Sequence, residues 1–176
     1  PTTANHAYRY KYWPAWSAQW EEVESSGKAL GYLTKIYPCS GCVKYGTGSA
    51  NGVLCVPALS KLAAATNVTL SFDCAPYAIP DSSTGSLAIV ATEGLNVTVY
   101  IVSGSGTIDG ATSKVLTNTS PDANGSNEAG YFIATHHEVT ITGADATTII
   151  GIASGNQPKY VAAKNRIWLD NLKVTK

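Results

Sequence analysis

Charge is scarce in this sequence, and neither sign is in excess. Lys and Arg together number 12, Asp and Glu also number 12, and charged residues make up 14% of the 176 positions. A protein that binds nucleic acid or an anionic membrane surface needs a basic patch, and this composition does not favour one. No apolar run approaches the roughly 18 residues that a membrane-spanning helix requires. We therefore expect no nucleic-acid partner and no membrane insertion.

Familiar catalytic motifs are also missing. The sequence holds no nucleophile elbow, phosphate-binding loop or dinucleotide-binding motif, and its Gly-x-Gly runs are typical of turns. The carboxylates Asp73, Asp109, Asp122 and Asp145 lack a spacing that marks a glycosidase pair. His136-His137-Glu138 is the one run that suggests a catalytic or metal site. Because adjacent residues on a strand point to opposite faces, we interpret it as a solvated strand end and expect no enzyme activity.

No sustained helical period occurs in the chain, whereas short Val-, Ile-, Thr- and Tyr-rich runs recur between turn-forming residues. This pattern predicts an all-β fold of about ten strands, a β-sandwich of the jelly-roll type. Two local features are a brief helical turn at 59–65, from its Ala and Leu content, and a hairpin signal at Asn51-Gly52. The length suits a single domain over residues 1–176, and we expect the aromatic segment 1–28 to pack on it.

The last strand, Asn165–Thr175, organises the fold. Apolar and polar residues alternate along it, with a one-residue phase slip at Asp170-Asn171 that predicts a β-bulge or a pair of polar ligands. A strand this apolar must be paired inside a sheet, because an exposed edge of that kind would aggregate. We expect Trp168 to lie in the core.

The four cysteines leave three states open. Cys39 and Cys42 have the spacing of a metal or redox pair, but Cys55 and Cys74 stand singly in strand-like runs. Buried or free thiols, one or two disulfides, and metal binding are all compatible with this arrangement.

The densest aromatic cluster lies in residues 1–28. Tyr8, Tyr10 and Tyr12 share one strand face by alternation, and three tryptophans follow at Trp13, Trp16 and Trp20. Flat aromatic rings stack on the apolar faces of sugars, and Arg9, Gln19 or Asn127 can add hydrogen bonds. The alternative is that the same rings belong to the core or cover a sheet. Second-line candidates for sugar contact are Tyr77, Tyr100, Tyr131 and Tyr160.

Three segments resemble a known family. Gly31-Tyr-Leu followed by Val43–Leu59 looks like a pattern common in surface proteins of gut Bacteroidetes, and Val68–Tyr77 and Asn165–Val174 are similar to later segments of the same domains. These domains resemble the galactose-binding-like β-sandwich, the jelly roll of many non-catalytic carbohydrate-binding modules. The likeness covers about residues 31–175, and residues 1–28 lie outside it.

The resemblance implies a non-catalytic carbohydrate-binding module that recognises a poly- or oligosaccharide. Such a module is secreted or displayed on the cell surface, tethered to a catalytic or surface module, and a monomer. The start at Pro1 is consistent with a processed or excised segment of a larger protein. The alternatives are a structural or adhesive cell-surface domain without a sugar site, and a small jelly-roll glycanase or lyase.

The resemblance also implies a structural calcium ion. In that family a closing Asp on the last strand often helps to hold Ca²⁺, which brings forward Asp170, with Asn171 or an acidic residue from Glu21 to Glu24. Calcium takes about six to eight oxygen ligands, and this chain offers carboxylates, amides and carbonyls. The alternative is that Asp170 only hydrogen-bonds a neighbouring loop.

Overall fold

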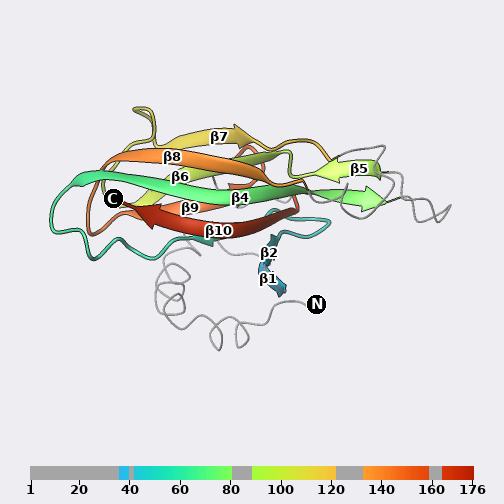
Figure 1. The fold of residues 1–176 in the computed structure, drawn as a ribbon, viewed down its shortest axis with the longest axis horizontal. Helices are drawn as coiled ribbons and strands as arrows, with labels where there is room; N and C mark the ends of the chain where they lie inside the picture. The colour runs from blue at the N-terminus through green and yellow to red at the C-terminus, as the bar shows by residue number, and fades with distance from the viewer. Residues whose placement is uncertain (1–35, 40–41, 81–88, 122–132, 159–163) are drawn as a thin grey trace.

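The computed structural model describes residues 36–39, 42–80, 89–121, 133–158 and 164–176, and these residues form ten strands and no helix (Figure 1). The predicted all-β class is therefore confirmed. The strands are β1 (Ile36–Cys39), β2 (Cys42–Tyr45), β3 (Val53–Cys55), β4 (Thr66–Pro80), β5 (Ile89–Glu93), β6 (Asn96–Ser103), β7 (Ser113–Thr117), β8 (Thr135–Ala144), β9 (Ile149–Ser154) and β10 (Ile167–Thr175).

The strands form two antiparallel sheets. One sheet has six strands in the order β1-β2-β10-β4-β5, with β8 also paired to β4. The long strand β4 is its centre, since residues 66–74 pair with β8 and residues 77–80 pair with β5. The second sheet has four strands in the order β3-β9-β6-β7. Figure 1 shows β8, β4 and β10 running side by side over β6 and β9.

One hydrophobic core lies between the two sheets. Alternation along β4 turns Val68, Leu70, Phe72 and Cys74 to one face, and all of them are buried. They belong to the same cluster as inward-facing residues of the other sheet, namely Val97, Val99, Ile150 and Ile152. Two sheets that share one core in this way form a β-sandwich, as the sequence predicts.

Strand β10 confirms two expectations about the end of the chain. It lies between β2 and β4 and is paired to both, so the last strand is inside the sheet. Its pairing with β4 shifts register between Asp170 and Lys173, which is the predicted bulge. Asn171 has a φ of 52° there, a left-handed conformation that Asn tolerates better than most residues.

Two local predictions are wrong, and a third holds in part. His136 and His137 are the second and third residues of β8, so they lie at a strand end, where His136 is exposed but His137 is buried. Residues 59–65 form a turn, with the Leu62 amide donating to the Leu59 carbonyl at 2.9 Å, and no helix. Asn51-Gly52 does not close a hairpin, because β2 and β3 belong to different sheets.

Residues 46–52 pass from one sheet to the other, and their contacts with the end of β9 explain why they do not form a hairpin turn. Asn51 is buried and its Nδ2 donates to the Ser154 carbonyl at 3.2 Å, while the Gly52 amide donates to Ser154 Oγ at 2.9 Å. These bonds tie the segment to the end of β9. A Cβ on Gly52 would lie 2.5 Å from the Tyr45 Cβ, so a glycine is needed for the chain to pass so close.

Candidate functional site

A group of aromatic and charged side chains gathers on the outer face of the six-stranded sheet. Trp168 lies between the core residues Ile167 and Leu169 and therefore points away from the core. It stacks on Tyr77 of β4, with 5.9 Å between ring centroids and 17° between ring planes. We call Trp168, Tyr77, Arg166, Glu93 and Lys44 the outer-face cluster.

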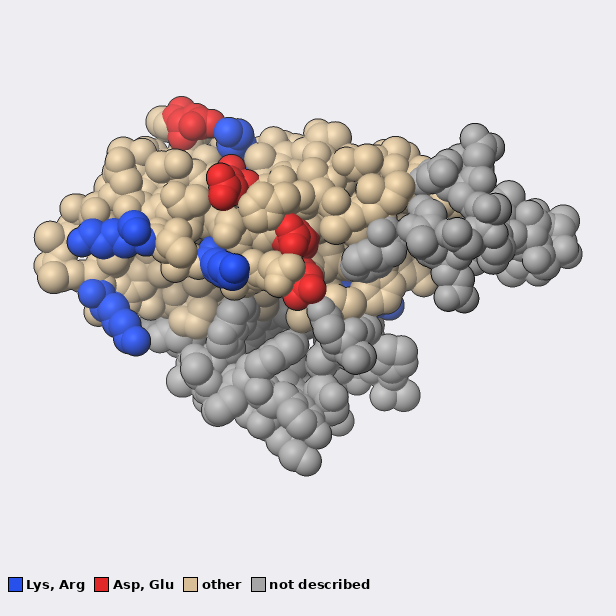
Figure 2. Space-filling model, viewed as in Figure 1, with Lys and Arg blue, Asp and Glu red and all other residues tan. Residues whose placement is uncertain are grey.

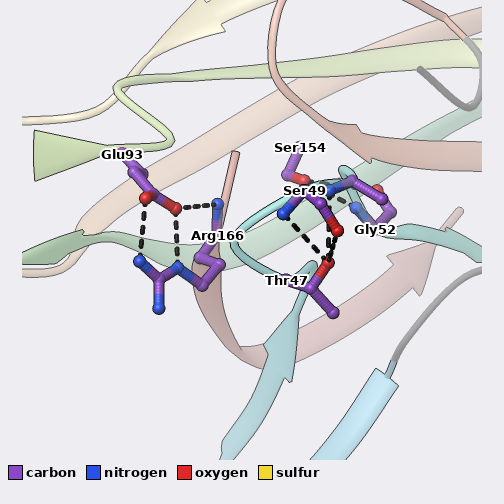
Figure 3. A network of polar contacts seen from close by, with 7 residues as sticks. Thr47, Ser49, Gly52, Glu93, Ser154 and Arg166 are labelled. Carbon is purple, nitrogen blue, oxygen red and sulfur yellow. Dashed lines mark hydrogen bonds and ion pairs between the residues drawn. The ribbon is translucent and has the colours of Figure 1, made fainter. Parts of the chain in front are cut away.

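Arg166 holds this cluster together. Its Nε donates to Glu93 Oε2 at 2.6 Å and its Nη2 donates to Oε1 at 2.8 Å, a two-pronged pairing that fixes the plane of the guanidinium group (Figure 3). The Arg166 backbone amide also donates to Oε2, at 3.4 Å. The Arg166 Cζ lies 4.0 Å from the Tyr77 ring centroid, and the Lys44 Nζ lies 5.7 Å from it. Tyr77 is thus held by Trp168 and by cations.

The pair between Glu93 and Arg166 is partly sheltered from water. Glu93 exposes 8% of its surface, and the hydrogen bonds from Arg166 hold the pKa of its carboxyl below the ordinary value. The same hydrogen bonds raise the pKa of the Arg166 guanidinium. Both groups therefore stay charged across the neutral pH range.

The turn between β5 and β6 packs against the backbone of Arg166. Gly94 has a φ of 73°, and a Cβ there would lie 2.3 Å from the Arg166 carbonyl oxygen and 2.3 Å from Ile167 Cγ2. Glycine lets the turn pack directly on the backbone of Arg166. The 46–52 segment, closed by Thr47 Oγ1 accepting from the Ser49 and Ala50 amides, is drawn beside the pair in Figure 3.

A row of hydrogen-bonded polar side chains continues along the same face. Asp73 Oδ1 lies 2.7 Å from His136 Nδ1, Asp73 Oδ2 accepts from Asn171 Nδ2 at 2.7 Å, and His136 Nε2 lies 3.6 Å from Glu138 Oε1. We call Asp73, His136, Asn171 and Glu138 the polar row. The polar row lies next to the outer-face cluster because of the strand pairing. Asp73 pairs with Asp170, while Ala75, two residues along β4, pairs with Trp168.

The polar row has displaced pKa values. The hydrogen bond from Asn171, followed by the one from His136, lowers the pKa of the Asp73 carboxyl. The hydrogen bond to Asp73 raises the pKa of the exposed His136 above its ordinary value. A protonated His136 beside an ionised Asp73 is therefore favoured in mildly acidic solution.

His137 points into the protein and is separate from the polar row. Its Nε2 lies 2.8 Å from Asn118 Oδ1, its ring lies 5.3 Å from the Phe72 ring, and burial lowers its pKa. The two histidines face opposite sides of β8, as the sequence predicts. In the described ranges, no three His, Cys, Asp or Glu side chains are grouped so that they could hold a metal ion.

The residues predicted to bind calcium lie at the bulge of β10. Asp170 Oδ1 accepts from the Asn171 amide at 2.7 Å, and the Asn171 side chain donates to Asp73. One oxygen of Asp170 thus already has a protein donor, and a calcium ion here would need main-chain carbonyls, water or other acidic groups to complete its ligands. Calcium at Asp170 and Asn171 stays a prediction.

The six aromatic residues predicted to stack on sugar lie outside the described residues; they are Tyr8, Tyr10, Tyr12, Trp13, Trp16 and Trp20. Their role also stays a prediction. Of the second-line candidates, Tyr77 is in the outer-face cluster, Tyr100 is buried, and Tyr131 and Tyr160 are not described.

Trp168 is a correction to the sequence analysis, because it lies on the outer face and not in the core. The alternation of Ile167, Trp168 and Leu169 was the signal that could have shown this. The pairing of Arg166 with Glu93 was not foreseen, since 73 positions separate the two residues and no local pattern connects them.

Three cysteines have described side chains, namely Cys42, Cys55 and Cys74, and of these Cys55 and Cys74 are buried free thiols. Burial raises the pKa of Cys55 and that of Cys74 to about 12. A thiol with such a pKa carries almost no thiolate at neutral pH and is a poor nucleophile or metal ligand. Cys55 and Cys74 therefore do not add chemistry to the outer face.

Comparisons with known proteins give structural neighbours only. No family model and no curated protein matches the chain. Solved structures with similar folds include a "Family 16 Carbohydrate Binding Module-2" (TM-score 0.43, 15% identity, covering 83% of this chain and 87% of that chain). Another is the K3 adhesin domain of Lys-gingipain from Porphyromonas gingivalis W83 (TM-score 0.42, 19% identity, covering 77% and 74%).

A third neighbour is CBM28, described as specific for non-crystalline cellulose (TM-score 0.35, 11% identity, covering 81% of this chain and 79% of that chain). Carbohydrate-binding modules and adhesin domains are thus among the solved structures to which this chain is similar. The β-sandwich itself is established by the strand pairing described above. Among the described residues, no helix has the length and hydropathy to cross a membrane.

Proposed function

We propose that this chain is a non-catalytic carbohydrate-binding module that binds a poly- or oligosaccharide on the outer face of its six-stranded sheet. The observation that carries the proposal is the stacking of Trp168 on Tyr77 on that face, with Arg166 and Glu93 held rigidly beside them. Aromatic surface takes the C–H faces of a pyranose ring, and fixed planar polar groups take its hydroxyls.

The polar row extends this site along the sheet. His136, Glu138 and Asn171 offer donors and acceptors on the same face as Trp168, about two residues along the strands. The spacing suits a ligand that lies extended across several strands. Figure 2 shows small groups of acidic and basic residues among many uncharged ones on the visible face, with no large patch of one sign, which favours a neutral ligand over a strongly charged one.

The electrostatics of this face support binding rather than glycoside hydrolysis. A general acid needs a carboxyl whose pKa is raised toward neutrality. Glu93 and Asp73 have the displaced carboxyl pKa values on this face, and both are lowered. Both carboxylates are also engaged by protein donors, so their role here is to orient Arg166, His136 and Asn171.

The wider setting follows from a binding role. We infer a secreted or cell-surface location and tethering as a monomeric module to a catalytic or surface domain. Stacking on one or two rings gives weak binding per site, and tethering raises the effective concentration of the module at the polysaccharide.

Affinity electrophoresis through gels that contain a panel of soluble polysaccharides tests the proposal. We expect retardation by at least one polysaccharide, and its loss in Trp168→Ala and Tyr77→Ala. Val115→Ala is the matched control, because Val115 is an exposed apolar residue on the other sheet. Circular dichroism of each variant reports whether the fold is kept.

The same gels separate the alternatives. Loss of retardation in Trp13→Ala, Trp16→Ala or Trp20→Ala, with Trp168→Ala unaffected, would move the site to the N-terminal aromatic residues. No retardation of the wild type by any polysaccharide would overturn the proposal and favour the structural or adhesive domain.

A further inference from the structure

Asn118 connects three parts of the molecule at one edge of the sandwich. It directly follows β7, and its backbone amide donates to the Leu95 carbonyl at 2.7 Å. Its Nδ2 donates to the Gly94 carbonyl at 2.8 Å, and its Oδ1 lies 2.8 Å from Nε2 of His137 in β8. One residue therefore ties the end of β7 to the turn between β5 and β6 and to β8 of the opposite sheet.

These hydrogen bonds fix the orientation of the Asn118 amide and the tautomer of His137. A carbonyl oxygen only accepts, so the amide atom beside the Gly94 carbonyl must be the donor Nδ2. Oδ1 then faces His137 Nε2, which must carry the proton of the bond at 2.8 Å. The reversed amide would set Oδ1 against the Gly94 carbonyl, where two acceptors repel each other. His137 in its Nε2–H form therefore orients Asn118.

The turn that Asn118 holds is the one that packs on Arg166. Gly94 follows Glu93, the last residue of β5, and an added Cβ on Gly94 would lie 2.3 Å from the Arg166 carbonyl oxygen. Glu93 is held on one side by its pairing with Tyr77 of β4, and on the other by the anchored turn. Arg166 takes its orientation from Glu93 through the bonds at 2.6 and 2.8 Å.

We propose that Asn118 is a positioning residue for the pair between Glu93 and Arg166, with His137 holding the Asn118 amide in the required orientation. A displaced turn would move the backbone of Glu93, and Glu93 sets the plane of the guanidinium group whose Cζ lies 4.0 Å from the Tyr77 ring centroid. Asn118 thus acts on the outer-face cluster through the turn.

The inference deepens the proposed function and rests on it in one respect. The link from Asn118 to Arg166 is carried by contacts within the protein and does not require sugar binding. An effect of Asn118 on sugar affinity follows only if Arg166 belongs to the binding site, as proposed above. The link and the affinity are therefore measured separately.

Hydrogen exchange of the Arg166 Nε–H, followed by ¹H–¹⁵N NMR on the full chain, tests the link. The sequence has two arginines, Arg9 and Arg166, and the signal that is lost in Arg166→Lys identifies Arg166. This N–H donates to Glu93, so its exchange rate reports how often the pair opens. We expect Asn118→Ala to raise the rate about tenfold, because the Gly94 carbonyl loses its donor and the turn loosens.

Thr135→Val is the matched control. Thr135 Oγ1 accepts from the Thr119 amide at 2.6 Å and donates to Thr119 Oγ1 at 3.0 Å, so it also joins β8 to the segment after β7. These bonds lead to Thr119 and not to the turn between β5 and β6. We expect the Arg166 exchange rate of this variant to stay within about twofold of the wild type. Urea unfolding of each variant measures the change in global stability.

Substitutions of His137 test the orientation of the amide, and they replace Asn118→Ala if that variant does not fold. His137→Gln keeps an N–H donor for Asn118 Oδ1, whereas His137→Leu removes it. We expect a rate close to that of the wild type in His137→Gln and about tenfold faster exchange in His137→Leu. A role in packing alone would make the two variants alike, because both lack the ring that lies 5.3 Å from the Phe72 ring.

Affinity electrophoresis of the same variants measures the effect on binding. Retardation by the polysaccharide that the wild type binds should fall in Asn118→Ala and His137→Leu. It should be kept in Thr135→Val and His137→Gln.

An Arg166 exchange rate that is unchanged in Asn118→Ala, or raised equally in Thr135→Val, would overturn the inference. Equal rates in the two His137 variants would overturn the role of His137. A faster rate with unchanged sugar affinity would keep the link and place Arg166 outside the sugar site. A wild type that binds no polysaccharide would overturn the proposed function alone, because the exchange rates still decide the link.

Discussion

Replacing Arg166 by Ala is expected to destabilise the fold strongly, because it leaves a sheltered carboxylate without its partner. The change removes the two side-chain hydrogen bonds to Glu93, at 2.6 and 2.8 Å, and the guanidinium group that lies 4.0 Å from the Tyr77 ring centroid. Only the backbone amide at 3.4 Å would still reach Glu93, which is 8% exposed.

The magnitude follows from this burial. Removing one partner of a buried ion pair costs about 3–5 kcal/mol. Because the Arg166 side chain is 20% exposed and water can enter when it is truncated, we expect a loss of about 2–4 kcal/mol in the free energy of unfolding, including about 0.5–1 kcal/mol from the contact with Tyr77. Lys114→Ala is the matched control. Its bond to Asp109 is also short, at 2.7 Å, but the two side chains are 41% and 70% exposed, so about 0–1 kcal/mol is expected.

The assay is urea unfolding followed by circular dichroism, at pH 7 and again near pH 3.5. The Glu93 pKa is lowered in the folded protein from an ordinary value of 4.5, so its contribution is present above that value and is lost as the pH falls through the folded pKa. The gap between wild type and Arg166→Ala should therefore narrow in acid. A loss no larger than that of Lys114→Ala, or a gap that does not narrow, would refute the electrostatic reasoning.

Three further predictions concern the polar row, a turn and the bulge. In an NMR titration the pKa of His136 should lie above 6.5, so its stabilising pairing with Asp73 is lost as the pH rises through the folded pKa. Asp73→Asn should bring the pKa of His136 back toward 6.5. No change in this pKa on substitution would contradict the prediction. Gly94→Ala should lower the free energy of unfolding in urea by about 2 kcal/mol or more. Gly110→Ala is the control and should cost about 1 kcal/mol, because Gly110 has a similar positive φ but open space around it. Equal costs would argue against close packing at Gly94. If Asp170 helps to bind calcium, millimolar Ca²⁺ should raise the melting temperature of the wild type but not of Asp170→Ala, and identical melting in Ca²⁺ and EDTA would remove calcium from consideration.

Much of the fold was predictable because side-chain direction in a strand is a local property. Alternation in β4 identifies Val68, Leu70 and Phe72 as core, and the structure buries all three. The phase slip at Asp170-Asn171 likewise predicts the observed bulge, because one extra residue reverses the alternation wherever the strand is paired.

The wrong predictions concern features that depend on residues far apart in the sequence. Asn51-Gly52 is a good turn sequence, but whether a turn closes a hairpin or crosses between sheets depends on the partner of the next strand, here β9. Trp168 was expected to lie in the core. Its neighbours Ile167 and Leu169 fill the core, so the pleat of β10 turns Trp168 outward.

By itself, the sequence determined the all-β class, the inward residues of the main strands and the bulge of β10, because these follow from periodicity within short stretches of chain. Only the tertiary structure decided that Tyr77 meets Trp168 and that Arg166 meets Glu93. Those outcomes depend on which strands pair, and strand pairing is set by the shared burial of residues that lie far apart in the chain.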